Sequence, residues 1–236
     1  LRQLTRLAAD FASLAAEATV RPLWDHSPMG PQMHSHFISL EGLYRFVSEH
    51  PTNAALLPNS PERRRLFRLA ADLTSSIPEE PGFYLWGRFE TNRLWRNVYL
   101  GKSGRGRTAS LRARVREELK DEAAFLWAPV LSGRVIRAGC PDRYGASTDR
   151  ALRKTGCSHI VWFADPALAD IDIPDIEADL IETMAPGANV IRPTPPPEPQ
   201  DYTHQVVGHF RRQVHDARKD GFPPAGHFLQ RIGVGA

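Results

Sequence analysis

The fold of this chain is decided by the stretch GFYLWGRFETNRLWRNVYLGK at residues 82–102. Aromatic and aliphatic residues fill 83–89 and again 95–100, and such residues favour β-strands because they pack well on a pleated surface. Thr91 and Asn92 lie between the two runs, where polar residues favour a turn. The stretch therefore predicts two neighbouring antiparallel strands joined by a short connection.

A basic loop and a helix follow these strands. Residues 101–107 read GKSGRGR, which is typical of an exposed glycine-rich loop. Over 108–120 the apolar residues Leu111, Val115 and Leu119 recur four positions apart and so fall on one helical face. The pattern predicts a helix that packs this face against the strands.

The region before the strands, 1–77, is predicted to be mainly helical. Apolar residues recur every three or four positions over 1–19, which predicts an amphipathic helix. A second helix is predicted to begin at Ser60-Pro61, because Ser is a preferred N-cap and Pro fits the first helical turn. Residues 20–59 have no regular pattern and are expected to be irregular.

The main domain is predicted to occupy 78–193. Besides the two strands, it contains a short apolar run at 159–163, typical of a buried strand, and a helical pattern at 174–184. Residues 194–236 begin as a stiff proline-rich linker and continue as a basic helical tail. The expected fold is α/β (α+β), with a helical region before the domain and a tail after it.

Composition narrows the class of protein. With 42% hydrophobic and 24% charged residues, the chain has the composition of a soluble globular protein. No apolar run is long enough to span a bilayer, so no membrane partner is expected. Two cysteines are too few for a disulfide framework and indicate a reducing cytoplasm, with a single disulfide between Cys140 and Cys157 as the alternative.

The net charge of +3 is unevenly distributed along the chain. Residues 82–120 contain ten Lys and Arg against three acids, a local net charge of 10 − 3 = +7, whereas 164–184 contain seven acids and no base. Basic segments attract phosphates, and acidic segments can hold a hard cation. A solvated polar surface is the alternative for both segments, so their meaning depends on the motifs inside them.

Five short motifs follow one another within the main domain. They are GFY at 82–84, YLGK at 99–102, LRAR at 111–114, Glu177 within IEADLI, and PGAN at 186–189. Each is weak alone, but in this order and spacing the set resembles the GIY-YIG nuclease family over about residues 80–193, roughly half of the chain. The resemblance implies a small three-stranded antiparallel sheet flanked by helices. It also implies metal-dependent hydrolysis of phosphodiester bonds in nucleic acid, usually DNA.

The resemblance places two tyrosines, an arginine and a lysine in the active site. Tyr84 and Tyr99 lie on neighbouring strands, where two phenols on one sheet face could orient or deprotonate a water molecule. Arg114 follows Leu111 by three residues and is expected to grip the scissile phosphate with parallel hydrogen bonds. Lys102 is expected to contact the phosphate or assist the attacking water. Without the resemblance, core tyrosines and a solvent-facing arginine would account for these residues.

Glu177 is predicted to bind the metal ion. It lies at the edge of the buried face defined by Leu180 and Ile181, and a partly desolvated carboxylate is costly unless it is paired or metal-bound. Mg²⁺ takes few protein carboxylates and completes its shell with water and phosphate, so one Glu is enough, and Mn²⁺ is the alternative ion. The resemblance also implies that Asn189 helps to shape the site. Without the resemblance, Asn189 would be interpreted as a turn residue.

The chain departs from the family pattern in its first two motifs, in a longer connection between Tyr84 and Tyr99, and at two places that bear on the chemistry and the substrate. Many members carry His or Tyr one turn after the arginine, but here Glu118 follows Arg114, and a carboxylate does not carry protons at neutral pH unless its pKa is raised. Tyr84, assisted by Lys102, is therefore predicted to activate the water. The stretch 121–158 is longer than a minimal domain needs, and such an insert is expected to contact DNA or to support a homodimer.

Together these features predict a metal-dependent endonuclease with DNA as its expected substrate. The side chains predicted to contact nucleic acid are Lys102, Arg105, Arg107, Arg112 and Arg116. The main alternative is a non-catalytic nucleic-acid-binding module, which would have no need of Glu177. A phosphodiesterase for small nucleotides, whose binding would depend little on salt, and a purely structural protein are further alternatives.

Overall fold

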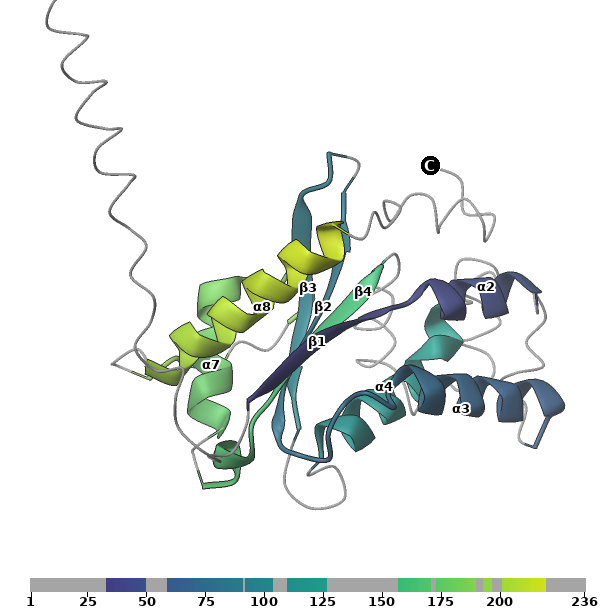
Figure 1. Cartoon of the computed structure of the whole chain (residues 1–236), viewed down its shortest axis with the longest axis horizontal. Helices are drawn as coiled ribbons and strands as arrows, with labels where there is room; N and C mark the ends of the chain where they lie inside the picture. Colours follow the sequence, from purple (N-terminus) through teal and green to yellow (C-terminus); the bar gives the residue numbers. More distant parts are fainter. Residues whose placement is uncertain are drawn as a thin grey trace, which may run out of the picture. The chain divides into compact units, whose positions relative to one another are not determined.

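The structure is a computed structural model (Figure 1). It describes residues 33–49, 59–90, 92–103, 110–126, 157–170, 173–189, 193–196 and 201–219. The helix predicted over 1–19 and most of the predicted insert over 121–158 lie outside these residues. Among the described helices, none is both long and apolar enough to cross a membrane.

A four-stranded antiparallel sheet forms the centre of the described fold (Figure 1). Its strands are β1 (His34–Ser39), β2 (Gly82–Phe89), β3 (Trp95–Lys102) and β4 (His159–Ala164). They lie in the order β1-β4-β2-β3, and each neighbouring pair is antiparallel. This arrangement confirms the α+β class and the predicted pairing of the two strands within 82–102.

The predicted number of three strands is wrong, because β1 comes from the segment 20–59 that was expected to be irregular. β1 reads HSHFIS, and with Phe37 and Ile38 as its apolar residues it shows neither clear alternation nor strong strand propensity. It is a strand because it pairs with β4, starting with His34 opposite Ala164. A pairing between segments so distant in sequence leaves no local pattern.

The connection between β2 and β3 is a short closed turn, as the sequence predicts. The N–H of Glu90 donates to the carbonyl of Leu94 at 2.8 Å, and the N–H of Leu94 donates to the side-chain oxygen of Asn92 at 2.9 Å. Seven of the eight residues of β2 are buried, with only Arg88 intermediate. Both faces of β2 are therefore covered, which explains its continuous apolar run in place of an alternating pattern.

Three helices cover one face of the sheet, namely α2 (Glu41–Glu49), α3 (Pro61–Leu73) and α4 (Leu111–Leu126) (Figure 1). The predicted stripe of α4, formed by Leu111, Val115 and Leu119, has 0% exposure and packs in the same core as Tyr84 and Trp86 of β2. The periodicity of 108–120 thus identified the buried face of this helix correctly.

The start of α3 also agrees with the sequence. The side chain of Ser60 accepts a hydrogen bond from the backbone N–H of Arg63 at 3.0 Å, and Pro61 occupies the first turn. This N-cap satisfies one of the backbone donors that a helix leaves unpaired at its start. At the other end, the hydroxyl of Thr74 donates to the carbonyl of Ala70 at 2.8 Å.

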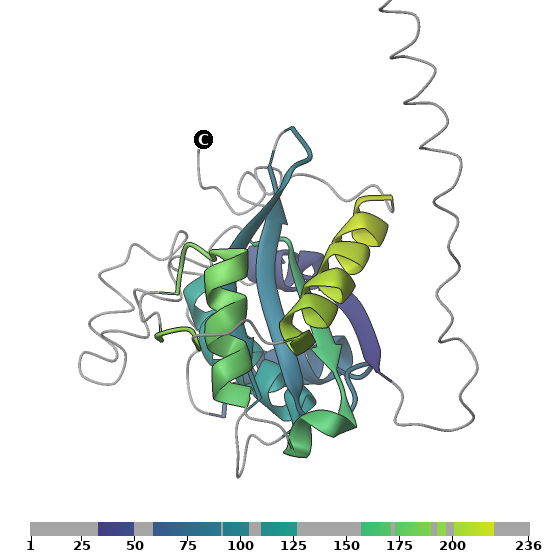
Figure 2. The ribbon, with the colours of Figure 1, turned by 90° about the vertical axis from the view of Figure 1, so that its left-hand side faces the viewer.

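Two helices, α7 (Ile173–Met184) and α8 (Asp201–Lys219), cover the opposite face of the sheet (Figure 2). α8 was predicted as part of a tail, yet Val206 and Phe210 on its inner side have 0% exposure and belong to the core of this face. The helix is also tied to β1, since the Ser35 hydroxyl lies 3.0 Å from Nδ1 of His209. Residues on both sides of 78–193 therefore help to build the same sheet and its cover.

His159, at the start of β4, places an ionisable ring in this core. Its imidazole has 0% exposure and makes ring contacts with Phe37, Phe89 and Trp95. Nδ1 lies 2.7 Å from the hydroxyl oxygen of Ser158. Burial lowers the pKa of His159 from 6.5 to about 4, because the charged ring would lose its hydration in the core.

The buried imidazole predicts a loss of stability in mild acid. The unfolded chain binds a proton at His159 below pH 6.5, whereas the folded chain does so only near pH 4. This residue should therefore lower the free energy of unfolding by about 2–3 kcal/mol as the pH falls through that window. Urea unfolding at neutral and acid pH measures this loss of unfolding free energy. The His159→Asn variant should lose less unfolding free energy over the same pH range. The same pH dependence in both proteins would contradict this assignment.

Candidate active site

Tyr84 of β2 and Tyr99 of β3 lie on the sheet face that α4 covers. The strand register sets Tyr84 opposite Gly101 and Trp86 opposite Tyr99, so the two tyrosines project from the same face, as predicted. Their ring centroids are 6.3 Å apart, and their exposed fractions are 0% and 8%. The hairpin therefore brings the two phenols together in a nearly buried position.

The motif glycines make this position possible. A Cβ atom on Gly101 would lie 2.3 Å from the hydroxyl oxygen of Tyr84, and one on Gly82 would lie 2.1 Å from the carbonyl oxygen of Phe163. Both distances are far below van der Waals contact. Gly101 thus leaves room for the Tyr84 ring, and Gly82 allows β2 to approach β4 closely.

The carboxylate of Glu118, on α4, is the centre of a buried hydrogen-bond network. Its side chain is 5% exposed and accepts a hydrogen bond from the Tyr84 hydroxyl. Nε1 of Trp86 donates to the second carboxylate oxygen at 3.2 Å. A guanidinium nitrogen of Arg114 lies 2.9 Å from the carboxylate, and Nε of the same residue lies 3.3 Å from the Tyr84 oxygen. These donors offset the cost of burying a charge.

This network determines the protonation of Tyr84 and Arg114. Burial raises the pKa of Tyr84 well above 10, and the charge of Glu118 raises it further. Burial acts to lower the pKa of Arg114, but the nearby Tyr84 and Glu118 outweigh it and raise that pKa. Tyr84 is therefore a neutral phenol at physiological pH, with its hydroxyl donated to Glu118.

Lys102 and Glu177 form a second polar pair. The Lys102 ammonium lies 2.8 Å from a carboxylate oxygen of Glu177, and the two side chains are 25% and 21% exposed. Lys102 stands opposite Phe83 in the strand register, on the sheet face that α7 covers. The Glu118 network and the Lys102–Glu177 pair therefore lie on opposite faces of the sheet, but at the same end of the β2–β3 hairpin.

Asn189 holds the end of α7 against the outer edge of β3. Its side-chain oxygen accepts from the N–H of Leu100 and its amide nitrogen donates to the carbonyl of Leu100, both at 2.8 Å. The N–H of Ala188 adds a bond to the carbonyl of Val98 at 2.7 Å. Asn189 thus acts like one residue of an additional strand. This contact fixes the position of α7, which carries Glu177.

The side chains predicted to contact nucleic acid have mixed surroundings. Arg112 bonds to the carbonyl of Ile77 and lies 2.9 Å from Glu79, and Arg116 donates to the Thr74 hydroxyl at 3.1 Å. These two arginines therefore connect α4 to the segment after α3. Arg105 and Arg107 lie outside the described residues, and Lys102 is paired with Glu177.

Glu118 belongs to the cluster although the sequence analysis treated it as a departure from a family pattern. Two spacings in the sequence indicate that Glu118 belongs to this cluster. Glu118 follows Arg114 by four residues, a spacing that favours ion pairs on a helix, and it follows Val115 by three, which puts it beside the buried stripe. Trp86 could have been found because it shares the strand face of Tyr84, two residues away.

The assignment of the site rests on these motifs and their geometry. Comparison with models of known protein families gave no match, and neither did comparison with curated proteins or with solved structures. In the described part of the chain, no group of three or more His, Cys, Asp or Glu side chains could hold a metal ion. A metal site at Glu177 would therefore need a shell completed largely by water and substrate, as Mg²⁺ sites often have.

Removing the central carboxylate should destabilise the fold. Glu118→Ala is expected to lower the free energy of unfolding by about 3–5 kcal/mol, because the partly buried Arg114 and the Tyr84 hydroxyl lose their acceptor. Glu117→Ala removes the neighbouring, exposed carboxylate of the same helix. This variant should change the free energy of unfolding by less than about 0.5 kcal/mol. Urea unfolding compares the two variants. A similar small effect from both would contradict the network.

A second test adds a single methyl group beside Tyr84. Gly101→Ala should lower the unfolding free energy by about 1–3 kcal/mol, because the new Cβ overlaps the Tyr84 ring and displaces it. Gly187→Ala is the matched control, since a Cβ there meets no atom within 4 Å. Thermal unfolding of both variants measures the difference. Equal stability of the two variants would show that Tyr84 does not occupy this space.

Proposed function

We propose that this chain is a metal-dependent endonuclease that hydrolyses phosphodiester bonds in nucleic acid, with DNA as its substrate and a GIY-YIG-type active site. The supporting observation is that motif residues far apart in sequence form two contacting pairs, on opposite faces of the sheet, at the same end of the β2–β3 hairpin. Arg114 lies 3.3 Å from Tyr84, and Lys102 lies 2.8 Å from Glu177. Metal-assisted hydrolysis requires a carboxylate near such cationic groups, and Glu177 supplies one.

Arg114 is the group that holds the scissile phosphate. Its side chain is 32% exposed, so the guanidinium can reach a bound phosphate while it keeps its bond to Glu118. Glu118 keeps the guanidinium charged and oriented, so that little rotational freedom is lost when the phosphate binds. Glu118 is thus a positioning residue in this scheme, and it replaces the proton carrier that the family pattern would put there.

The two tyrosines act together beside Arg114. Tyr84 is fully buried and remains a neutral phenol, because burial and Glu118 raise its pKa, and its hydrogen bonds to Glu118 and Arg114 orient the guanidinium. Tyr99 packs beside it with ring centroids 6.3 Å apart, and as the less buried phenol it is the one that would align the attacking water.

Glu177 is the residue that would hold Mg²⁺ or Mn²⁺. When bound, such an ion supplies positive charge to the phosphate and stabilises the leaving oxygen. Glu177 fits this role because its carboxylate is partly exposed, 21%, and is kept in place by Asn189 through α7. Lys102 neutralises Glu177 in the free protein, and its ammonium is near enough to contribute a second positive charge to the phosphate.

Cleavage of a supercoiled plasmid tests the proposal. Wild type should nick or linearise the plasmid with Mg²⁺ and leave it intact with a chelator. Glu177→Ala should reduce the rate by at least about a hundredfold, because the ion loses its protein ligand. The control is Glu182→Ala, which changes an exposed carboxylate of the same helix and should cut at the wild-type rate. Cleavage by Glu177→Ala at the wild-type rate would refute this mechanism.

The alternative is a nucleic-acid-binding module that keeps the scaffold without cutting. The Lys102–Glu177 ion pair favours it, since a carboxylate already paired at 2.8 Å is not in need of a metal ion. The plasmid assay separates the two functions. Salt-sensitive binding without cleavage under Mg²⁺ or Mn²⁺ would favour the binding module.

A further inference from the structure

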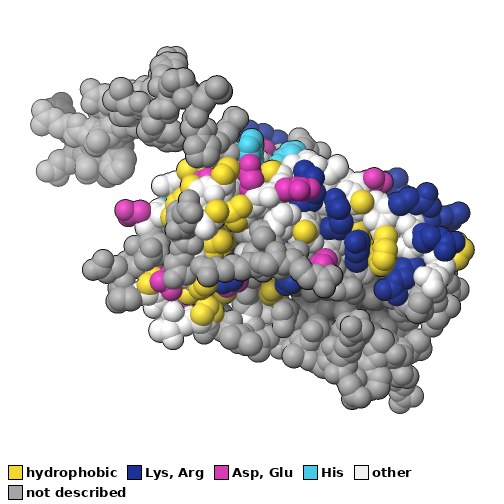
Figure 3. All heavy atoms as spheres, turned by 90° about the horizontal axis from the view of Figure 1, so that it is seen from below, with side chains coloured by type: hydrophobic (Ala, Val, Ile, Leu, Met, Phe, Trp, Pro, Cys, Tyr) yellow, Lys and Arg dark blue, Asp and Glu magenta, His cyan; other side chains and the backbone are white. Residues whose placement is uncertain are grey.

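The helix α3 carries a dense run of positive charge that the proposed active site does not use. Its sequence PERRRLFRLAADL contains Arg63, Arg64, Arg65 and Arg68 with no acid between them. Arg64, Arg65 and Arg68 are exposed, whereas Arg63 is half-buried. Figure 3 views the molecule from the lower side of Figure 1, where α3 lies, and shows Lys and Arg side chains gathered at its right-hand end.

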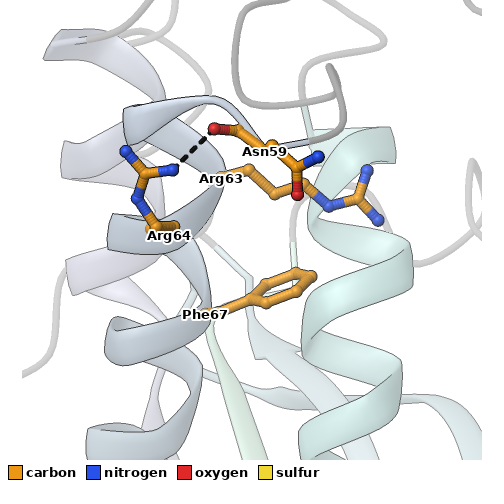
Figure 4. A pocket seen from close by; sticks show the side chains of 4 residues that line it. All are labelled: Asn59, Arg63, Arg64 and Phe67. Carbon is orange, nitrogen blue, oxygen red and sulfur yellow. Dashed lines mark hydrogen bonds between the residues drawn. The ribbon is translucent and has the colours of Figure 1, made fainter.

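A pocket opens at the beginning of this helix (Figure 4). It has a volume of about 360 Å³ and is lined by Asn59, Arg63, Arg64 and Phe67. Arg64 donates to the carbonyl of Asn59 at 2.7 Å, which holds its guanidinium at the rim. The lining combines two cationic groups with one aromatic ring, a chemistry suited to an anion attached to a flat or apolar group.

The ring of Phe67 contacts cations from two helices. The guanidinium carbon of Arg63 lies 5.2 Å from the centre of the Phe67 ring, and the ammonium of Lys120, on α4, lies 5.0 Å from it. Both cations are attracted to the ring, so Phe67 adds Lys120 of α4 to the positive charge of α3. We call Arg63, Arg64, Arg65, Arg68 and Lys120 the α3 basic patch.

The patch lies close to the proposed active site along α4. Lys120 follows Arg114 by six residues, which corresponds to about 9 Å along a helix axis. A duplex advances 3.4 Å per base pair, so this separation corresponds to roughly three base pairs. Six residues also turn the helix by about 600°, so Lys120 projects about 120° away from Arg114 around α4. A broad substrate such as a duplex could span this angle and place phosphates near both residues.

We propose that the α3 basic patch binds the sugar–phosphate backbone of duplex nucleic acid next to the site of cleavage. This inference rests on the proposed function, because the position of the substrate relative to the patch assumes that the scissile phosphate lies at Arg114. The patch takes over the role predicted for Arg112 and Arg116, which are bound to Glu79 and Thr74. Its contacts are with phosphates, so they supply affinity and orientation without reading the base sequence.

Fluorescence anisotropy with a labelled DNA duplex in chelator tests the patch without cleavage. Arg65→Gln together with Arg68→Gln removes two exposed charges from α3. The matched control, Arg211→Gln with Arg218→Gln, removes two exposed charges from α8, on the other face of the sheet. Circular dichroism checks that both variants are folded. A duplex RNA of the same sequence shows whether the patch distinguishes the two backbones.

The α3 variant should bind about tenfold more weakly than wild type, and the slope of log K against log salt should become shallower by about two, as expected for two lost phosphate contacts. The α8 variant should bind within about twofold of wild type. Equal losses in both variants, no loss in the α3 variant, or no binding by wild type would each overturn the inference. The plasmid assay tests cleavage separately from this binding experiment. Binding that depends on the α3 basic patch, without plasmid cleavage, would support the patch and refute the endonuclease.

Discussion

The register of the β2–β3 hairpin is the constraint on which the candidate site depends. Successive residues of a strand point to opposite faces, so a slip of one residue would move one strand's side chains to the wrong side of the sheet. Pairing Tyr84 with Gly101 lets the phenol share a face with Tyr99 and meet α4, and it leaves Lys102 on the opposite face beside α7. Gly101 permits this register, because any side chain there would overlap the Tyr84 ring.

Two further interactions turn this register into a site. On one face, Glu118 accepts hydrogen bonds from Tyr84, Trp86 and Arg114, so a buried charge holds three groups of the cluster in one arrangement. On the other face, Asn189 bonds to both backbone groups of Leu100 and sets the position of α7. The first interaction makes Tyr84 harder to ionise, while the second brings Glu177 to Lys102. Both act at the same end of the hairpin.

The sequence allowed prediction of the elements whose signals are local. The hairpin, the stripe of α4 and the Ser60 cap all follow from periodicity or from residue chemistry within a few positions. β1 could not be predicted, because its strand character comes from pairing with β4. The contribution of α8 to the core was missed for a similar reason, since a basic helix after a proline-rich linker has the pattern of a tail until a partner for its apolar side is known.

The candidate site was only partly predictable for the same physical reason. Motif order indicated which residues belong together, but not that they divide into two clusters on opposite faces of the sheet. Charge alone also does not show which arginines are paired within the protein: Arg112, predicted to contact nucleic acid, lies 2.9 Å from Glu79. The exposed arginines of α3 were overlooked because their helix lies outside the segment that carries the motifs.

The central claim is that Glu177 is the carboxylate that binds a divalent cation, and Mn²⁺ binding followed by electron paramagnetic resonance tests it most directly. The titration uses the full chain without nucleic acid, with Glu177→Gln and the exposed Glu182→Gln compared with wild type. The account predicts that Glu177→Gln weakens binding at least about tenfold, that Glu182→Gln does not, and that Lys102→Met strengthens it by removing a competing cation. Equal affinity of wild type and Glu177→Gln for Mn²⁺ would contradict the account.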